Sequence, residues 1–306
     1  VGSLEREMRH AMRTTSPLLL VLLVGCASGE AGPKKYPPTG KTKTFDLVAR
    51  DVEWTVGPGA VYRAWTYDGT VPGPQLDVIA GDTVVINLRN ETNHPVSIHT
   101  HLVEFEQSQD GVDPSSWAQP GQSVTVTWRT SYAGAVPYHD HADEGAGVTR
   151  GLIGALVVHP PDETTANEHV VVLTDLLPEH FKTLPGVADP LTGEFPDAGT
   201  YHGAHQYLHT INGRAYEDSV PHFTGTVGEL SRWHVISIGQ EVHTWHLHGH
   251  RWLDGDGTLT DNIQLAPGMY RSFEFIEDAV GDWLVHCHVP NHMEGGMMAR
   301  YRVAPR

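Results

Sequence analysis

One twelve-residue stretch near the end of the chain, His286–Met297, limits the folds that this chain can adopt. It begins with His-Cys-His at 286–288, and successive side chains of a β-strand point to opposite faces. The two imidazoles are therefore predicted on one face and the thiol on the other. A turn that brings His292 and Met297 back beside the thiol assembles the ligand set of a blue-copper electron-transfer centre. The stretch predicts one strand that contacts two metal sites.

The remainder of the chain has the pattern of short β-strands. Of the 306 residues, 32 are glycine and 21 are proline, and apolar residues often alternate with polar ones, as at 83–88 and 123–128. A period of two is typical of half-buried strands. The length suits about two domains, and the polar segment after Pro160 interrupts the strands. We therefore predict an all-β fold of two tandem β-sandwiches, at 45–160 and 161–306.

The N-terminal 26 residues have the pattern of an export signal. Basic residues around Arg9 and Arg13 precede an apolar run at 17–24, and Leu-Val-Gly-Cys at 23–26 resembles a bacterial lipobox, in which the cysteine is lipidated. We predict an exported protein, periplasmic or at the cell surface, that is lipid-anchored through Cys26. A flexible tether at 27–44 is predicted to follow. A plain signal peptide, cleaved nearby, is the alternative.

Histidine is unusually frequent, with 21 copies, and many of them fall in four clusters. His-X-His pairs stand at 99–101, 139–141, 246–248 and 286–288, and each pair is predicted to share one face of a strand. Together the four pairs supply eight imidazoles. Because neutral imidazole is a good copper ligand, the clusters favour copper binding.

In their order and internal spacing, the four clusters resemble the signature of multicopper oxidases, and the two-domain length resembles the small bacterial laccases. The resemblance covers nearly the whole chain after the export signal, including Pro-Gly-Pro at 72–74, Gly-Asp-Thr-Val at 81–84 and Ile-Asn-Gly at 211–213. It implies two tandem cupredoxin-like Greek-key domains. It also implies four coppers: one of type 1, one of type 2 and a type-3 pair.

The same resemblance implies a ligand for each copper. The type-1 copper is expected to be bound by His243, Cys287, His292 and the weak axial ligand Met297. The type-2 copper is expected at His99 and His246. The type-3 pair is expected at His101, His139, His141, His248, His286 and His288.

The first domain departs from the pattern of a blue-copper domain. Its second pair reads His139-Asp140-His141, with aspartate where a type-1 copper needs cysteine. We therefore predict that the only type-1 centre lies in the second domain. Two-domain oxidases of this kind are homotrimers in which the first domain of one subunit and the second domain of its neighbour share each trinuclear cluster. The resemblance implies the same assembly here.

Narrower expectations concern polar residues around these clusters. The resemblance implies that electrons enter at the exposed edge of His292 and that Asp261 helps to deliver protons, an ordinary turn aspartate being the alternative for Asp261. Small laccases commonly carry a tyrosine shortly after the first pair, and Phe105 stands at that position. His250 and Trp252 are expected to pack beside the third pair.

Three further histidines, His202, His205 and His209, lie in the strand-poor segment 177–209. They are predicted to be surface residues, with copper capture as the alternative.

The predicted function is oxidation of phenols or aromatic amines coupled to the reduction of dioxygen to water. A formal net charge of −17 argues against nucleic acid or an anionic membrane surface as a partner. The alternatives are a cuprous or ferrous oxidase, a copper nitrite reductase, and a non-enzymatic copper carrier or electron-transfer protein. The small number of methionines, six, disfavours the first alternative. The surplus of paired histidines disfavours the second.

Overall fold

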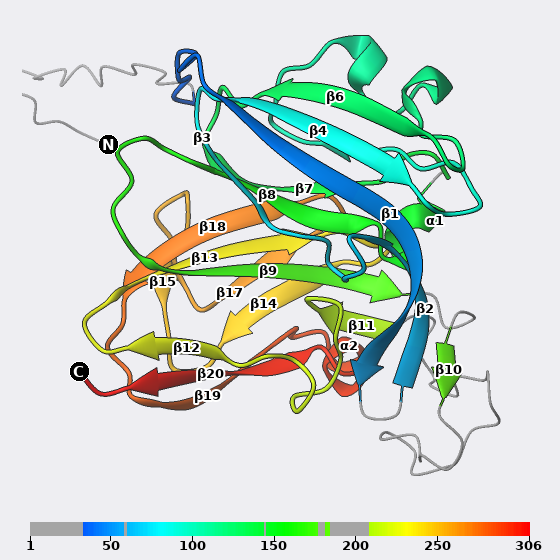
Figure 1. Ribbon diagram of the computed structural model, residues 1–306. Coiled ribbons are helices and arrows are strands. Elements are labelled where there is room, and N and C mark those ends of the chain that lie inside the picture. The colour runs from blue at the N-terminus through cyan, green and yellow to red at the C-terminus, as the bar shows by residue number, and fades with distance from the viewer. Residues whose placement is uncertain (1–32, 58–59, 144, 177–180, 184–207) are drawn as a thin grey trace, which may run out of the picture. The chain divides into compact units, whose positions relative to one another are not determined.

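The computed structural model describes residues 33–57, 60–143, 145–176, 181–183 and 208–306 (Figure 1). The predicted export segment with Cys26, and also His202 and His205, lie outside the described residues. Lys34–Arg306 form one unit. In the described part of the chain, no helix is long and apolar enough to cross a membrane.

Two sheets make up the first half of the described chain. Their strands are β1 (Thr42–Gly57), β2 (Ala60–Tyr67), β3 (Leu76–Ile79), β4 (Thr83–Asn90), β5 (His99–Thr100), β6 (Ser123–Arg129), β7 (Gly134–His139), β8 (Ile153–His159) and β10 (Phe181–Thr183). One sheet has the order β10-β2-β1-β4-β6 and the other has the order β3-β8-β7-β5.

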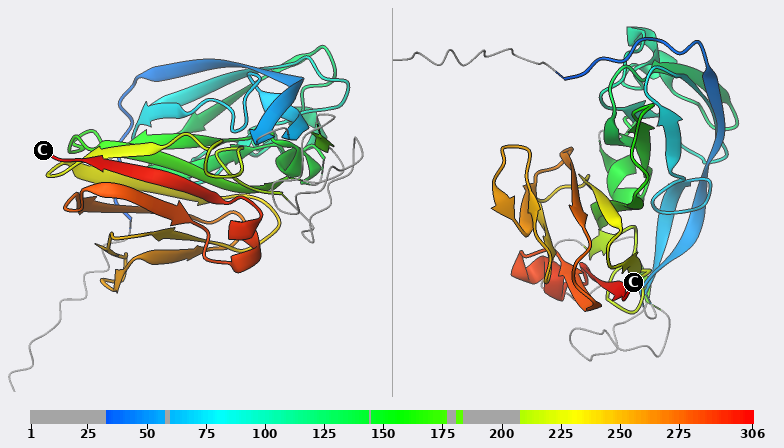
Figure 2. Two further views of the ribbon diagram at one scale, coloured as in Figure 1. Left: turned by 90° about the horizontal axis from the view of Figure 1, so that it is seen from below. Right: turned by 90° about the vertical axis from the view of Figure 1, so that its left-hand side faces the viewer.

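Two larger sheets and a short hairpin make up the second half. Their strands are β9 (Asn167–Leu176), β11 (Leu208–Ile211), β12 (Phe223–Thr226), β13 (Leu230–Ser237), β14 (His243–Leu247), β15 (Trp252–Leu253), β16 (Leu259–Thr260), β17 (Asn262–Leu265), β18 (Tyr270–Ile276), β19 (Gly281–His286) and β20 (Met298–Ala304). The sheet orders are β11-β9-β13-β18 and β12-β20-β19-β14-β17, and β15 pairs with β16. In Figure 2 the blue and cyan strands lie in one group of sheets and the orange and red strands in another, while the green strand β9 belongs to the sheet of the yellow β13.

The two halves share a pattern of strand pairing. In the first half β1 pairs in parallel with β4, and β3 with β8. In the second half β9 pairs in parallel with β13, and β12 with β20. Parallel neighbours within mainly antiparallel sheets require the chain to cross between the two sheets of a sandwich, as Greek-key connections do. The predicted fold class, two tandem cupredoxin-like β-sandwiches, is confirmed.

Short helices lie in the loops after two of the histidine pairs. The first, α1 (Ala146–Arg150), follows the pair at 139–141, and α2 (Pro290–Glu294) follows the pair at 286–288. Pro290 begins α2 at a position where the missing N–H has no helical partner to lose. Two 3-10 turns, Gln107–Gln109 and Pro114–Ser116, follow the pair at 99–101.

Alternating burial along the strands explains the core of the first half. In β4, Val84, Ile86 and Leu88 are fully buried, while the residues between them are partly exposed. They pack with Trp128 of β6 and Leu156 of β8, which belong to the two different sheets. Each fully buried aliphatic side chain of this kind contributes roughly 1.5–3 kcal/mol, so this alternation holds the two sheets together.

The core of the second half includes part of the predicted metal site. Trp233 and Trp245 are fully buried at its centre, and Cys287 and Met297 belong to the same cluster. A third apolar cluster combines strands from both halves, with Tyr62 among its members. The cores therefore fix both halves and place the thiol of Cys287 in a dry environment.

The first strand begins earlier than predicted. Thr42 to Thr44 are exposed and carry no apolar alternation, but they pair in parallel with Thr83 to Val85 of β4. Main-chain pairing therefore extends the strand into the predicted tether, where the side-chain pattern carries no signal. The short strand β10, which follows the predicted domain boundary in sequence, pairs with β2 of the first half.

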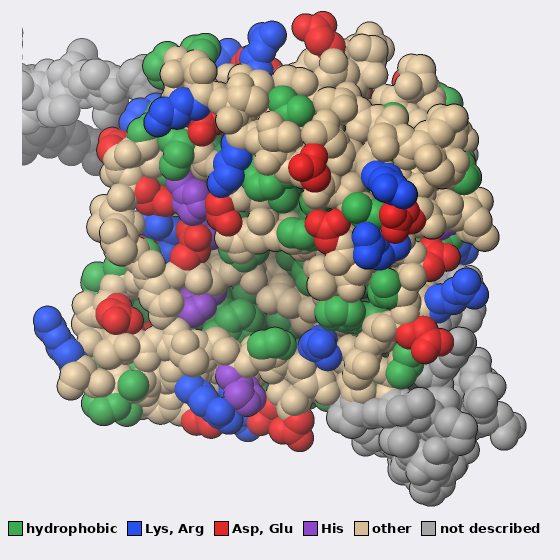
Figure 3. All heavy atoms as spheres, in the orientation of Figure 1, with side chains coloured by type: hydrophobic (Ala, Val, Ile, Leu, Met, Phe, Trp, Pro, Cys, Tyr) green, Lys and Arg blue, Asp and Glu red, His purple; other side chains and the backbone are tan. Residues whose placement is uncertain are grey.

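The charged surface contributes little to this arrangement. On the face in Figure 3, acidic and basic side chains are interspersed over the described surface. Exposed ion pairs include Arg89 with Glu91 and Arg302 with Asp282. Because such pairs contribute roughly 0–1 kcal/mol each, the three apolar clusters are the main source of stability.

Candidate metal centre

Three of the four predicted type-1 ligands bring their donor atoms together. His243 begins β14, Cys287 directly follows β19, and His292 lies in α2. The two Nδ1 atoms of His243 and His292 are 3.1 Å apart, and Cys287 Sγ lies 4.0 Å and 3.6 Å from them. Donors that bind one metal ion at about 2.0–2.3 Å are themselves roughly 3–4 Å apart. The spacing fits a single metal ion among these three side chains.

Met297 is held next to this group by its main chain. Its carbonyl accepts a hydrogen bond from the Cys287 N–H at 3.1 Å, and its own N–H donates to the His292 carbonyl at 3.0 Å. Met297 is fully buried in the same apolar cluster as Cys287. The residues of the predicted type-1 site are therefore linked by backbone hydrogen bonds as well as by packing.

The electrostatics of this group favour a bound cation. Burial opposes ionisation of Cys287, but hydrogen bonds from His243 and His292 outweigh it and lower the thiol pKa to about 5. Burial also opposes a positive charge on His243, yet Asp175 and Cys287 raise its pKa to about 9. Positive charge is thus stabilised between a thiolate and a carboxylate, and a copper ion supplies such a charge. The residues present fit a type-1 copper.

Two carboxylates that the sequence analysis did not identify orient the imidazoles. Asp175, fully buried in β9, has Oδ1 3.0 Å from His243 Nε2 and accepts the backbone N–H groups of Gln240 and Glu241 at Oδ2. Glu241 places Oε2 2.9 Å from His292 Nε2. Carboxylates on the outer nitrogens fix the tautomer of metal-binding imidazoles. Both rings are therefore set with Nδ1 facing the thiol.

The expectation that His292 has an exposed edge is wrong. His292 is only 4% exposed, because α2 holds it against the core and Glu241 covers its Nε2. Glu241 itself is 32% exposed in its side chain. Within the described residues, the Glu241 carboxylate therefore joins His292 to the solvent-exposed surface.

The surface position predicted for His209 is also wrong. His209 lies in β11, is 1% exposed, and stacks on the ring of His292 with the centroids 3.9 Å apart. Its Nδ1 lies 2.8 Å from Asp175 Oδ1. Pairing of β11 with β9 carries His209 into the interior, although the sequence before it has no strand pattern.

Four histidines of the first half form one group, which we call the first quartet: His99, His101, His139 and His141. The ring of His99 contacts the other three at centroid distances of 4.9–5.4 Å. The Nε2 atoms of His101 and His139 are 3.5 Å apart. Burial lowers the pKa of His139 to about 3, and burial with neighbouring imidazoles lowers the pKa of His101. The lowered pKa values favour neutral rings at His101 and His139, and the neutral form is the one that binds metals.

The second quartet consists of His246, His248, His286 and His288. The Nε2 atoms of His248 and His286 are 3.1 Å apart, and the ring of His288 lies 5.3 Å from that of His246. Burial and the neighbouring imidazoles lower the pKa of His248 and His286. His286 and His288 thus flank Cys287 in sequence but join a different group, as the alternation of a strand predicts.

Backbone carbonyls fix the nitrogen that each ring presents. His99 Nδ1 lies 2.8 Å from the Asp110 carbonyl, and His246 Nδ1 lies 2.9 Å from the Asp261 carbonyl. In both rings the hydrogen-bonded Nδ1 leaves Nε2 free for a ligand. The residues of both quartets therefore fit copper.

The two quartets remain separate within one chain. Among the described residues, ring contacts of the predicted ligands occur inside each quartet and not between them. His248 and His288 are exposed. The second quartet therefore has an open side, and each quartet is half of the larger site that the sequence predicts.

The residues with narrower predictions lie beside the quartets. The Asp261 side chain is 60% exposed, with Oδ1 3.9 Å from His246 Nδ1, so its role in proton delivery stays a prediction. Phe105 contacts the edge of His99 at 5.9 Å. His250 is buried and joins the His248 carbonyl to Glu277, and Trp252 stacks on Phe273 at 3.8 Å. These last two pack as expected.

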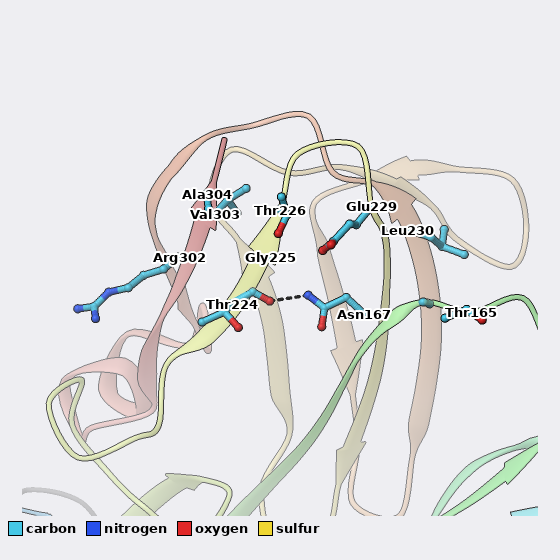
Figure 4. Close-up of a pocket in the computed structure, with 11 residues that line it drawn as sticks. Thr165, Asn167, Thr224, Gly225, Thr226, Glu229, Leu230, Arg302, Val303 and Ala304 are labelled. Carbon is cyan, nitrogen blue, oxygen red and sulfur yellow. Dashed lines mark hydrogen bonds between the residues drawn. The ribbon is translucent and has the colours of Figure 1, made fainter. Parts of the chain in front are cut away.

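A pocket of about 880 Å³ lies elsewhere in the second half (Figure 4). Asn167 Nδ2 donates to the Thr224 carbonyl at 2.6 Å within it, and Glu229 and Arg302 are its charged residues. Its lining contains none of the predicted metal ligands. The candidate metal centre is therefore a set of buried and half-buried side chains, and not this pocket.

Two profiles, both described as multicopper oxidase, match the sequence over residues 49–163 and 189–306. The chain belongs to the multicopper oxidase family. It is 31% identical over 278 residues to a probable nitrite reductase-hydroxylamine oxidoreductase fusion protein of Kuenenia stuttgartiensis, covering 85% of this chain and 31% of that protein. It is 27% identical over 297 residues to human ferroxidase HEPHL1, covering 80% of this chain and 25% of that protein.

A solved multicopper oxidase structure has nearly the same extent. It matches with a TM-score of 0.73 and 25% identity, over 89% of this chain and 93% of the other. By contrast, this multicopper oxidase spans a third or less of the length of the two curated relatives. The family implies copper binding. The geometry of the predicted type-1 site and of the two quartets fits copper.

Proposed function

We propose that this multicopper oxidase takes single electrons from phenols or aromatic amines and reduces dioxygen to water. The observation that carries the proposal is the His286–His288 segment. Its central thiol faces His243 and His292, whereas its two imidazoles belong to the second quartet. Two peptide bonds therefore connect the proposed electron-accepting site to the proposed oxygen-reducing site.

When bound, copper supplies the redox chemistry: a type-1 site accepts one electron at a time, and a trinuclear cluster delivers four electrons to dioxygen. The protein contributes the geometry. Asp175 holds His243, Glu241 holds His292, and burial keeps Cys287 dry. Removing a carboxylate that contacts the outer nitrogen of a metal-binding imidazole typically changes metal affinity or activity about 10–100-fold.

Glu241 is the group that a reducing substrate would meet first. Its Oε2 lies 2.9 Å from His292 Nε2, while about a third of the side chain remains exposed. A phenol becomes much more acidic as it loses an electron, and a carboxylate within reach can take the proton. We therefore assign proton acceptance from the substrate to Glu241 Oε1 or Oε2.

We further propose that the oxygen-reducing site is completed between subunits of a homotrimer. The two quartets do not contact each other within one chain, and His248 and His288 are exposed. One cluster bound by all eight histidines requires the first quartet of one copy to meet the second quartet of another. A cyclic trimer satisfies this head-to-tail contact with a closed ring. Such an assembly would hold four coppers for each subunit, one of type 1 and three in a shared cluster.

A cuprous or ferrous oxidase is the second candidate, and Glu241 again favours it. Its partly exposed carboxylate would bind a cation directly beside His292. The relative named ferroxidase HEPHL1 points the same way, although this chain covers only a quarter of it. A nitrite reductase remains the third candidate, through the Kuenenia fusion protein.

One copper-loaded sample distinguishes the candidates. Oxygen uptake is measured with a phenol, an aromatic amine, Fe(II) and Cu(I), and nitrite consumption is measured without oxygen. We expect the organic donors to give the highest kcat/KM and the blue band to bleach with phenol and return with oxygen. An intact blue band with no oxygen uptake from any donor would sink the oxidase proposal in favour of an electron carrier.

Replacement of Glu241 then separates the two oxidase candidates. Glu241→Gln keeps an acceptor for His292 but removes the charge. With a phenol, kcat/KM should fall about 10–100-fold, and most of the loss should vanish with a donor that releases no proton. If instead only Fe(II) oxidation weakens, through a higher KM, Glu241 is a cation site. Glu91→Gln, an exposed carboxylate of the first half, is the control.

The export signal leads to a separate proposal. We propose that Cys26 carries the lipid anchor of an exported protein, as its lipobox-like setting indicates. Mass spectrometry of the mature N-terminus tests this: a lipidated Cys26 supports anchoring, and a free N-terminus beyond it supports a plain signal peptide.

A further inference from the structure

The ring of His209 lies flat against His292. The two centroids are 3.9 Å apart and the ring planes differ by 20°. His209 is 1% exposed and His292 is 4% exposed. A buried face-to-face pair of imidazoles in a core is an arrangement that burial alone does not require, so its position beside a predicted ligand calls for a reason.

Both nitrogens of His209 are directed at carboxylates. Nδ1 lies 2.8 Å from Asp175 Oδ1, the oxygen that also lies 3.0 Å from His243 Nε2. Nε2 lies 3.7 Å from Glu241 Oε2, the oxygen that holds His292 Nε2. His209 thus touches both carboxylates that orient the ligands. Its ring thus lies beside His292 and between the two carboxylates that face the outer nitrogens of His243 and His292.

The neighbouring loop is built to admit this ring. Gly295 follows α2, and a Cβ at that position would lie 3.1 Å from His209 Cδ2 and 3.0 Å from the Asn291 carbonyl. Any side chain there would push the ring of His209 or distort the end of α2. The absence of a side chain at 295 and the stacked pair therefore belong to one arrangement.

We propose that His209 is a positioning residue for the type-1 site, whose ring fixes the plane of His292 and shields it from water. The proposal rests on the copper-binding role proposed above for His292. The His209 ring makes the larger contribution to this positioning, because it stacks on one face of the His292 ring. The Asp175 contact aims the ring and adds a second, smaller link to His243.

The expected consequences follow from solvent access. A dry, weakly polar surrounding favours the reduced, less charged state of a redox site, and water favours the oxidised state. Removing the ring opens space beside His292. The reduction potential of the blue site should therefore fall, and copper should leave faster because His292 is free to turn away.

Three variants separate the ring from its hydrogen bond. His209→Ala removes both, His209→Phe keeps a stacking ring without Nδ1–H, and His209→Asn keeps a donor near the Nδ1 position without a ring. His169→Ala is the matched control, because His169 is a buried histidine of β9 whose ring packs tilted against Trp233 and, among the described residues, has no ring contact with a predicted ligand. The readouts are the potential of the blue site and the rate of copper loss to a chelator.

We expect His209→Ala and His209→Asn to lower the potential and to speed copper loss by about tenfold or more. His209→Phe and His169→Ala should stay close to wild type. Wild-type values in His209→Ala, or restoration by His209→Asn, would overturn the proposal. If His209→Ala does not fold, the contrast between His209→Phe and His209→Asn still tests whether the ring positions His292. If the wild-type protein has a blue band but takes up no oxygen, the proposed oxidase function is wrong. The role of His209 at the blue site can still be tested in that case.

Discussion

The two halves of the molecule build the same loop frame around different side chains. In the first half the Asp140 N–H donates to the Leu152 carbonyl at 3.1 Å, and in the second the Cys287 N–H donates to the Met297 carbonyl at 3.1 Å. Each of the two aligned positions lies between the two histidines of a pair. The main chain therefore aligns Asp140 with Cys287 independently of the sequence pattern.

The same correspondence extends to every ligand of the predicted type-1 site. Leu152 N donates to the carbonyl of Gly147 at 2.9 Å, as Met297 N donates to that of His292 at 3.0 Å. Val96 stands three residues before His99, as His243 does before His246. In the order of the second-half ligands His243, Cys287, His292 and Met297, the first half has Val96, Asp140, Gly147 and Leu152.

By contrast with the type-1 positions, both halves have a hydroxyl residue that accepts a hydrogen bond from the second histidine of a pair. His141 N donates to Ser97 Oγ at 2.8 Å, and His288 N donates to Thr244 Oγ1 at 2.6 Å. The Ser97 N–H reaches Asp140 Oδ1 at 2.7 Å. The Thr244 N–H reaches the thiol instead. The frame that positions a histidine pair is thus separable from the predicted type-1 copper site, and the first half has only the frame.

The sharpest break in the comparison is the loss of the thiol. Cys287→Ser should abolish the blue band and oxidase turnover, because the oxygen cannot supply the thiolate ligand, while the fold remains. Absorption and oxygen uptake of copper-loaded protein measure this. A second change, Asp140→Cys in the same variant, should not restore the colour, because Val96 and Gly147 supply no imidazole. A blue band in Cys287→Ser would refute the ligand assignment.

The two quartets should be equally necessary yet separable between chains. His101→Ala and His248→Ala should each keep the blue band and lower oxygen reduction more than about 100-fold, since even outer contacts cost 10–100-fold. The two inactive proteins are then unfolded, mixed in equal amounts and refolded. If each site is shared between subunits, about a quarter of the activity should return, because each quartet is intact in half of the chains and a working site needs both quartets intact. Mixed protein that stays inactive would indicate that each chain builds its own site.

The loop frames also differ in the room they leave. A Cβ at Gly147 would lie 2.3 Å from Asp140 Oδ2, whereas the matching position in the second half holds the full ring of His292. Gly147→Ala should therefore destabilise the copper-free protein by about 1–3 kcal/mol, measured by urea unfolding. Adding Asp140→Ala should recover more than about 0.5 kcal/mol of that loss.

Gly255→Ala is the control for this effect, because nothing lies within 4 Å of a Cβ there. Equal destabilisation at positions 147 and 255 would show that the close fit of Gly147 against Asp140 has no energetic weight.

Much of this comparison follows from local sequence patterns. The alternation of strands places His286 and His288 apart from Cys287, and the replacement of cysteine by Asp140 is visible in the sequence. The residues of each quartet come together as the spacing predicts. These features depend on contacts between neighbours in sequence or on the regular geometry of a strand.

The residues that escaped prediction act across long separations. Asp175 and Glu241 meet the ligands only because β9, β14 and α2 converge. His209 stacks on His292 although it lies 83 positions earlier in the sequence. No alternation of apolar and polar residues around His209 indicates a buried strand. A single sequence shows neither pairing of distant strands nor which surface covers a ligand.

The smallest expected effect concerns the end of β8, where the halves differ in charge. His159 occupies the last position paired with β3, and Ala304 occupies the last position paired with β12 in the second half. His159 Nε2 lies 3.1 Å from Asp77 Oδ1, and Nδ1 lies 2.6 Å from Glu163 Oε2. Glu168 adds negative charge at 3.8 Å, while Arg232 binds Glu163 from the other side.

These contacts give His159 a pH-dependent role that Ala304 lacks. Burial lowers its pKa, but hydrogen bonds to Asp77 and Glu163 outweigh burial and raise it above the ordinary value. Folding therefore favours the protonated ring, so its stabilisation is complete below about pH 6.5 and is lost as the pH rises through the raised folded pKa.

The stability difference between wild type and His159→Gln should be less than about 1 kcal/mol, because Asp77 is half exposed. Thermal unfolding of both proteins between pH 5 and 9, about the range in which histidine titrates, should show this difference shrinking toward alkaline pH. A difference that grows with pH would mean that the neutral ring is the stabilising form, and that the carboxylates around His159 do not bind it as a cation.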